Sequence, residues 1–95
     1  MRRHYVAICM PLASGGWRAI VPDAHGYEVR ASSLDLVVAQ ARVELATYAA
    51  GLNGHAQQIL PLSRDLTEIR SDEQWIAANA IEWPGAVITM IPLSV

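Results

Sequence analysis

Two apolar segments, one near each end of the chain, constrain the fold more than any other feature. Residues 5–12 (YVAICMPL) and residues 86–93 (AVITMIPL) carry apolar side chains at almost every position. Because successive side chains of a strand point to opposite faces, each segment predicts a strand that is covered on both faces. A chain of 95 residues must therefore supply a cover for both sides of its sheet.

Two shorter segments predict further strands, and two turn signals separate them. Residues 17–21 (WRAIV) and 27–31 (YEVRA) have the alternation of strands, and the second has one polar face. Residues 14–16 (SGG) predict a hairpin turn, because glycine adopts the positive φ angles that tight turns require. The strongest turn signal follows the second strand, and its structural residues are Pro22, Asp23 and Gly26.

One long helix follows the third predicted strand. Ser33 is a suitable N-cap, and Gly51 or Gly54 is a suitable end. Residues 55–70 are predicted as a loop, and residues 71–80 as a short helix or loop with Ser71 as the cap. The long helix has one apolar stripe that we expect to pack on the sheet; its residues are Leu34, Val37, Val38, Ala41, Leu45, Tyr48 and Leu52.

These elements predict a single α+β domain over residues 1–95 with the order β-β-β-α-(short helix or loop)-β. One main helix covers only one face of a four-stranded sheet. The strands at residues 5–12 and 86–93 are apolar on the other face too. Self-association is the simplest cover at this size, so we expect a homo-oligomer, either a dimer or a tetramer.

Composition excludes several classes of protein. The chain is 53% hydrophobic and 17% charged, with a net charge of −2, which excludes a disordered tail and argues against direct nucleic-acid binding. No apolar run approaches the length of about 18 residues that a membrane span needs. Arg2 and Arg3 precede a short apolar run as in a signal peptide, but Pro11 interrupts that run, so we expect a cytoplasmic protein.

The sequence contains no recognisable catalytic, metal or cofactor motif. Cys9 is the sole cysteine and predicts a small buried strand residue, which excludes an intrachain disulfide. The histidines and acids are scattered, and Asp23 and Glu28 form the one pair that could approach for metal-dependent hydrolysis. Candidates for a partner or oligomer interface are aromatic and Arg side chains on the strands or beside them; they are Trp17, Arg18, Tyr27, Arg30 and Trp83.

The motifs together resemble the HicB-like antitoxin family. The first strand begins with Tyr5, a Gly-Trp pair opens the second strand, V-P-D-x-x-G spans residues 21–26, and S-L-D-x-x-x-x-Q-A begins at Ser33. The similarity covers residues 5–52 and the closing strand at residues 88–93. It implies a partial ribonuclease-H-like fold with no enzymatic activity.

The resemblance also implies a function within bacterial type II toxin-antitoxin systems. HicB-like proteins bind a HicA-type toxin, an mRNA-cleaving protein, and cover its active site. Many carry a C-terminal DNA-binding module; here the chain ends after the strand at residues 86–93, so we expect no direct binding to an operator. Two alternatives remain: an orphan oligomeric scaffold of the same fold with another partner, and a degenerate metal-dependent nuclease that uses Asp23 and Glu28.

Overall fold

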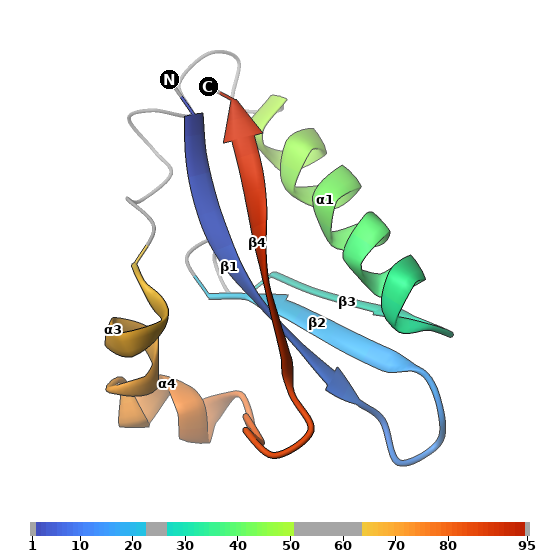
Figure 1. The fold of residues 1–95 in the computed structure, drawn as a ribbon, viewed down its shortest axis with the longest axis vertical. Coiled ribbons are helices and arrows are strands. Elements are labelled where there is room, and N and C mark those ends of the chain that lie inside the picture. The colour runs from blue at the N-terminus through green and yellow to red at the C-terminus, as the bar shows by residue number, and fades with distance from the viewer. Residues whose placement is uncertain (1, 23–26, 51–63, 95) are drawn as a thin grey trace.

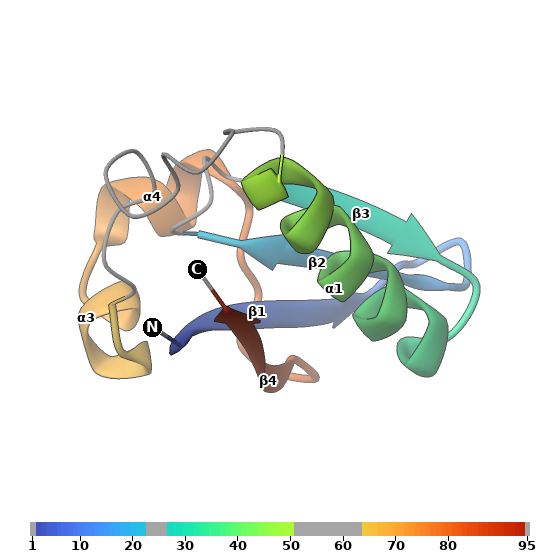
Figure 2. The ribbon, with the colours of Figure 1, turned by 90° about the horizontal axis from the view of Figure 1, so that it is seen from above.

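A four-stranded antiparallel sheet forms the centre of the protein, with α1 on one face and α3 and α4 on the other (Figures 1 and 2). The computed structural model describes residues 2–22, 27–50 and 64–94. The strand order is β3-β2-β1-β4. The predicted α+β class and the order of strands and main helix are confirmed. The elements are β1 (Arg2–Pro11), β2 (Trp17–Val21), β3 (Tyr27–Ala31), α1 (Leu34–Ala50), α3 (Leu66–Arg70), α4 (Glu73–Ala78) and β4 (Val87–Ser94).

The first apolar segment, β1, lies inside the sheet and pairs with strands on both sides. Its Ile8 is opposite Ile20 of β2 and opposite Ile88 of β4. The six side chains from Tyr5 to Met10 are all buried. This strand is therefore covered on both faces, as its sequence predicts. The second apolar segment, β4, lies at an edge of the sheet and is covered less completely.

One face of the sheet packs against α1, and we call it the α1 face. Its core contains Tyr5, Ala7 and Cys9 of β1 together with the buried side chains of α1; the latter are Val37, Ala41, Leu45 and Ala49. The Leu36 N–H donates a hydrogen bond to Ser33 Oγ at 3.2 Å. Ser33 is therefore the N-cap of α1, as the sequence predicts.

The opposite face, which we call the α3/α4 face, is covered by the chain itself. Val6, Ile8 and Met10 of β1 pack there against Ile69 of α3 and against Ile81. The half-buried side chains around this core include Leu66, Trp75, Ile76 and Trp83. The prediction of self-association assumed that this face of the sheet lacks a cover within the chain. That assumption is therefore wrong.

The helix α3 lies where the sequence predicts a loop. Asp65 is its N-cap, and the Glu68 N–H donates to Asp65 Oδ1 at 2.8 Å. In return, the Asp65 N–H donates to Glu68 Oε1 at 3.3 Å, which completes a capping box. The D-x-x-E spacing of these two residues is the sequence signal that would have predicted this helix.

The helix α4 begins one residue later than its predicted cap implies. Asp72 is its N-cap and accepts a hydrogen bond from the Trp75 N–H at 3.1 Å. Ser71 is instead the C-cap of α3, so its predicted role as the N-cap of α4 is wrong. Serine and aspartate are about equally good caps, so their order in the sequence did not decide between them.

The turn between β1 and β2 requires glycine at position 16. The φ angle of Gly16 is +85°, and a Cβ atom added there would lie 2.8 Å from the carbonyl oxygen of Ala31. Gly15 also has a positive φ, +92°, but no atom lies within 4 Å of its added Cβ. The predicted turn is confirmed, and it lies directly against the end of β3.

We expect Gly16→Ala to destabilise the protein by about 2–4 kcal/mol, and Gly15→Ala by about 1–2 kcal/mol. Both substitutions place a side chain at a positive φ, but only the methyl group at position 16 must displace backbone atoms. Urea unfolding of the two variants measures both losses. Equal losses would contradict a role for the contact between Gly16 and Ala31.

Candidate interaction site

The structure places the five predicted interface residues in different surroundings. Trp17 is half-buried and packs against the core of the α1 face. The backbone of Tyr27 belongs to β3, but its side chain lies outside the described residues. Of the turn that precedes it, Pro22 is buried, while Asp23 and Gly26 also lie outside the described residues.

Arg18 joins β2 to the end of α4. Its side chain is 16% exposed and points to the α3/α4 face. The guanidinium donates hydrogen bonds to the carbonyl oxygens of Asn79 at 3.0 Å and of Ala80 at 2.8 Å. It also contacts the Glu28 carboxylate at 3.2 Å and the Met10 sulfur at 3.6 Å. These contacts hold its charge within the fold.

The carbonyls that Arg18 binds belong to a turn that ends α4. The Ile81 N–H donates to the Ile76 carbonyl at 3.1 Å, and the Ala80 N–H to the Ala77 carbonyl at 3.3 Å. This pair of bonds is a Schellman motif, in which glycine is the usual residue at the position of Ala80. Ala80 adopts a φ of +52° there. The guanidinium complements the negative end of the helix dipole.

The exposed charge of this site lies on β3. Arg30 is opposite Arg18 in the pairing of β2 with β3, and its side chain is 66% exposed. The Glu28 carboxylate lies 3.2 Å from Arg18 Nη1 and 3.8 Å from Arg30 Nε. It therefore offsets the repulsion between two neighbouring guanidinium groups. Arg30 is therefore the more exposed of the two charged residues that the sequence predicts for an interface.

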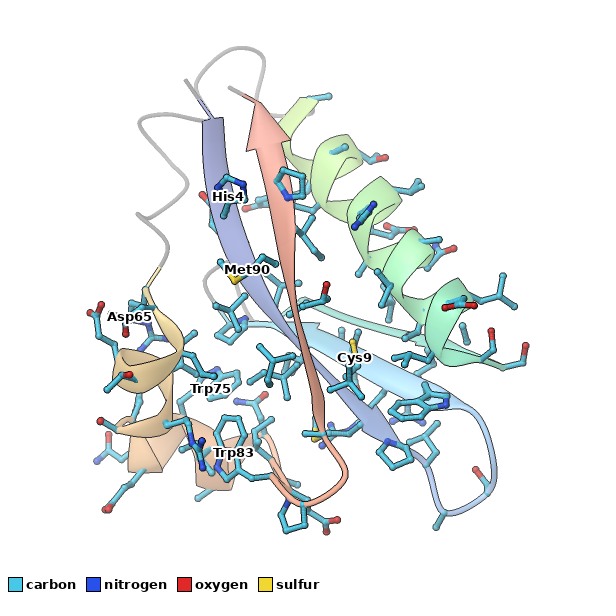
Figure 3. The ribbon with its side chains drawn as sticks, in the orientation of Figure 1. His4, Cys9, Asp65, Trp75, Trp83 and Met90 are labelled. Atoms are coloured by element: carbon cyan, nitrogen blue, oxygen red, sulfur yellow. The ribbon has the colours of Figure 1, made fainter. Side chains whose placement is uncertain are left out.

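Trp83 belongs to the packing of the α3/α4 face. It is half-buried against the core there, and the guanidinium carbon of Arg70 lies 5.0 Å from the centroid of its ring. This distance is typical of a cation–π contact. Trp75, from α4, packs against the same core (Figure 3). Both tryptophans therefore help to fix α3 and α4 on the sheet.

No metal site is formed by the described residues. Among them, no group of three His, Cys, Asp or Glu side chains is arranged to hold a metal ion. Glu28 is held by two Arg side chains, and Asp23 lies outside the described residues. Cys9 is buried on the α1 face (Figure 3), and burial raises the pKa of its thiol. A raised pKa keeps this sulfur protonated and unreactive at neutral pH.

Asp72 is the one described carboxyl group whose pKa is clearly lowered. The hydrogen bond from the Trp75 N–H is the largest cause, followed by the hydrogen bond from the Arg64 side chain. Arg64 Nη1 lies 3.0 Å from Asp72 Oδ2. The ionised form of Asp72 therefore stabilises the start of α4.

Several exposed apolar side chains on α1 and β4 are not among the interface residues that the sequence predicts. The exposed large apolar side chains of the described residues are Leu36, Val43, Val87 and Met90. The available signal is the spacing of Leu36 and Val43, seven residues apart and outside the apolar stripe that packs on the sheet.

Comparisons with known proteins found no match: no family model, no curated protein and no solved structure matches this chain. The helices in the described part of the chain are all too short or too polar to cross a membrane.

We expect Arg18→Ala to destabilise the protein by about 1.5–3 kcal/mol, because it leaves two carbonyl groups at the end of α4 without their charged donor and leaves Glu28 only its longer contact with Arg30. The matched control is Arg30→Ala, on the neighbouring strand, for which we expect a loss below about 0.5 kcal/mol. Urea unfolding of both variants tests this difference. An Arg18→Ala loss as small as that of the control would contradict the role of Arg18 in fixing α4.

The lowered pKa of Asp72 predicts a pH-dependent contribution to stability. The folded state binds this proton more weakly than the unfolded chain, so the contribution is present above the unfolded-state pKa of about 4 and is lost as the pH falls through the folded-state pKa. We expect the difference in unfolding free energy between the wild type and Asp72→Asn to shrink from about pH 5 to about pH 2. Urea titrations across this range measure it, and a constant difference would contradict the assignment.

Proposed function

We propose that this chain is a HicB-like antitoxin that binds a HicA-type mRNA-cleaving toxin and covers the toxin's active site. The observation that carries the proposal is the meeting of two motif segments that are separate in the sequence. Trp17, which opens the second strand, pairs with Ala31 just before the helix. Gly16 lies against the same residue, and Ser33 caps α1. The Gly-Trp pair and the segment that leads into α1 thus meet in the fold, while residues 23–26 of the V-P-D-x-x-G motif lie outside the described residues.

The charged edge of the sheet supports a protein as the partner. β3 is an edge strand, and it presents Arg30 beside Glu28 at the surface. An Arg side chain beside an acid can make paired contacts with a complementary protein surface. The net charge of −2 argues against RNA or DNA as a direct partner. We therefore propose β3 as the toxin-binding surface. The antitoxin role also implies a cytoplasmic location.

Co-expression with the product of a small adjacent reading frame tests the proposal. We expect that product to arrest growth, and this chain to restore growth and to form a soluble complex with it. In the purified complex we expect Arg30→Gln to weaken binding by about tenfold. The matched control, Arg70→Gln, removes an Arg charge from α3 and should leave the affinity within about twofold.

Two results would overturn parts of this proposal. If the adjacent product is toxic and soluble but growth is not restored, the antitoxin role is wrong. If the complex forms and the two Arg variants bind equally well, the role stands and the placement of the toxin on β3 is wrong.

A further inference from the structure

Two of the exposed apolar side chains, Val43 of α1 and Val87 of β4, line the same groove. Met90 is opposite Val6 and points to the α3/α4 face instead. A groove of about 510 Å³ runs between the two elements. Its wall on α1 includes Leu34, Val38 and Val43, and its wall on β4 is formed by residues 87–89. Val43 is 60% exposed although it lies on a helix that packs on the sheet through another side.

The two edges of the sheet differ in how they resist pairing. The β3 edge carries Glu28 and Arg30, and charged side chains on an edge strand oppose pairing with another strand. The β4 edge, residues 87–94, contains no charged residue. The described residues contain no further strand beside β4. Within the described residues, the outer side of β4 therefore has no strand partner, and it lies next to an apolar groove.

The outer side of α1 continues this surface. Leu36, Ala39 and Val43 are exposed and lie three to four residues apart, so they share one side of the helix. Leu36 is 54% exposed. The small side chain of Ala39, between the two larger ones, leaves room for a second helix to approach closely.

The charges beside the groove identify the occupant. Asp35 and Arg42 both line it and lie seven residues apart, which is two helical turns or about 10.5 Å. Neither has an ion-pair partner among the described residues. A two-fold axis near Ala39 would bring Asp35 of one copy opposite Arg42 of the other, and the reverse. Two helices running parallel about a two-fold axis would instead place like charges together.

We propose that the α1–β4 edge binds the same edge of a second copy of this chain, with the two α1 helices antiparallel about a two-fold axis near Ala39. Each copy contributes Leu36, Val43 and Val87 as apolar contacts, and the two copies form two reciprocal ion pairs between Asp35 and Arg42. An interface of this kind is isologous, since the same patch is used by both subunits. The proposal does not depend on the antitoxin role.

Sedimentation equilibrium of the purified full chain tests this interface through a charge reversal. We expect a wild-type dimer, and an Arg42→Asp variant whose dissociation constant is raised by about 10–100-fold, because two attractive pairs become two repulsive ones. The double variant, Asp35→Arg with Arg42→Asp, restores both pairs, and we expect its dissociation constant to return to within about threefold of the wild type. The control is Arg30→Asp, which reverses a charge on the other edge and should leave the dimer unchanged.

A second substitution tests the groove without involving an ion pair. Val87→Lys places a charge on the β4 edge, and we expect it to yield a monomer with a far-UV circular dichroism spectrum like that of the wild type. The proposal is overturned if the wild type sediments as a monomer, if Arg42→Asp and Arg30→Asp have equal effects, or if the double variant stays as weak as Arg42→Asp.

Discussion

Burial of β1 on both faces is the constraint from which the rest of the packing follows. Tyr5, Ala7 and Cys9 point to α1, while Val6, Ile8 and Met10 point to α3 and α4. Each set is too small to form a core alone, so each requires a helical cover. A strand with apolar side chains on both sides is stable only inside a three-layer structure. The two short helices are therefore as necessary to this fold as the long one.

The cover on the α3/α4 face depends on polar contacts as well as on burial. Two helices of five and six residues are too short to be stable in isolation. The capping box of Asp65 and Glu68, the cap at Asp72 and the guanidinium of Arg18 satisfy backbone groups at the helix ends. Arg18 is the one among them that reaches from the sheet. It links the stability of the short helices to that of the central strands.

The sequence predicted the parts of the fold that depend on local patterns. The strands at residues 17–21 and 27–31 and the cap at Ser33 lie where predicted, since alternation and capping act over a few residues. The cover of the second face could not be predicted in the same way, because Ile69 and Ile81 belong to no regular apolar pattern in the sequence and gain their role only through packing. For the same reason, Arg18 resembled a surface Arg in the sequence. The two carbonyl groups that it binds, in the turn that ends α4, lie 61 and 62 positions further along the chain.

The pairing of the first strand with the last strand has a consequence for how the protein folds during synthesis. β1 can form its hairpin with β2 as soon as the first residues leave the ribosome, but its other edge stays unpaired until β4 has been made. During that interval the nascent chain exposes an apolar strand, β1. The backbone groups on its β4 side are unpaired, and its apolar side chains are only partly covered. Folding of such a chain depends on contacts of long sequence separation and is slow for that reason. The time between synthesis of β1 and release of β4 is therefore the period in which a chaperone would matter most to this protein.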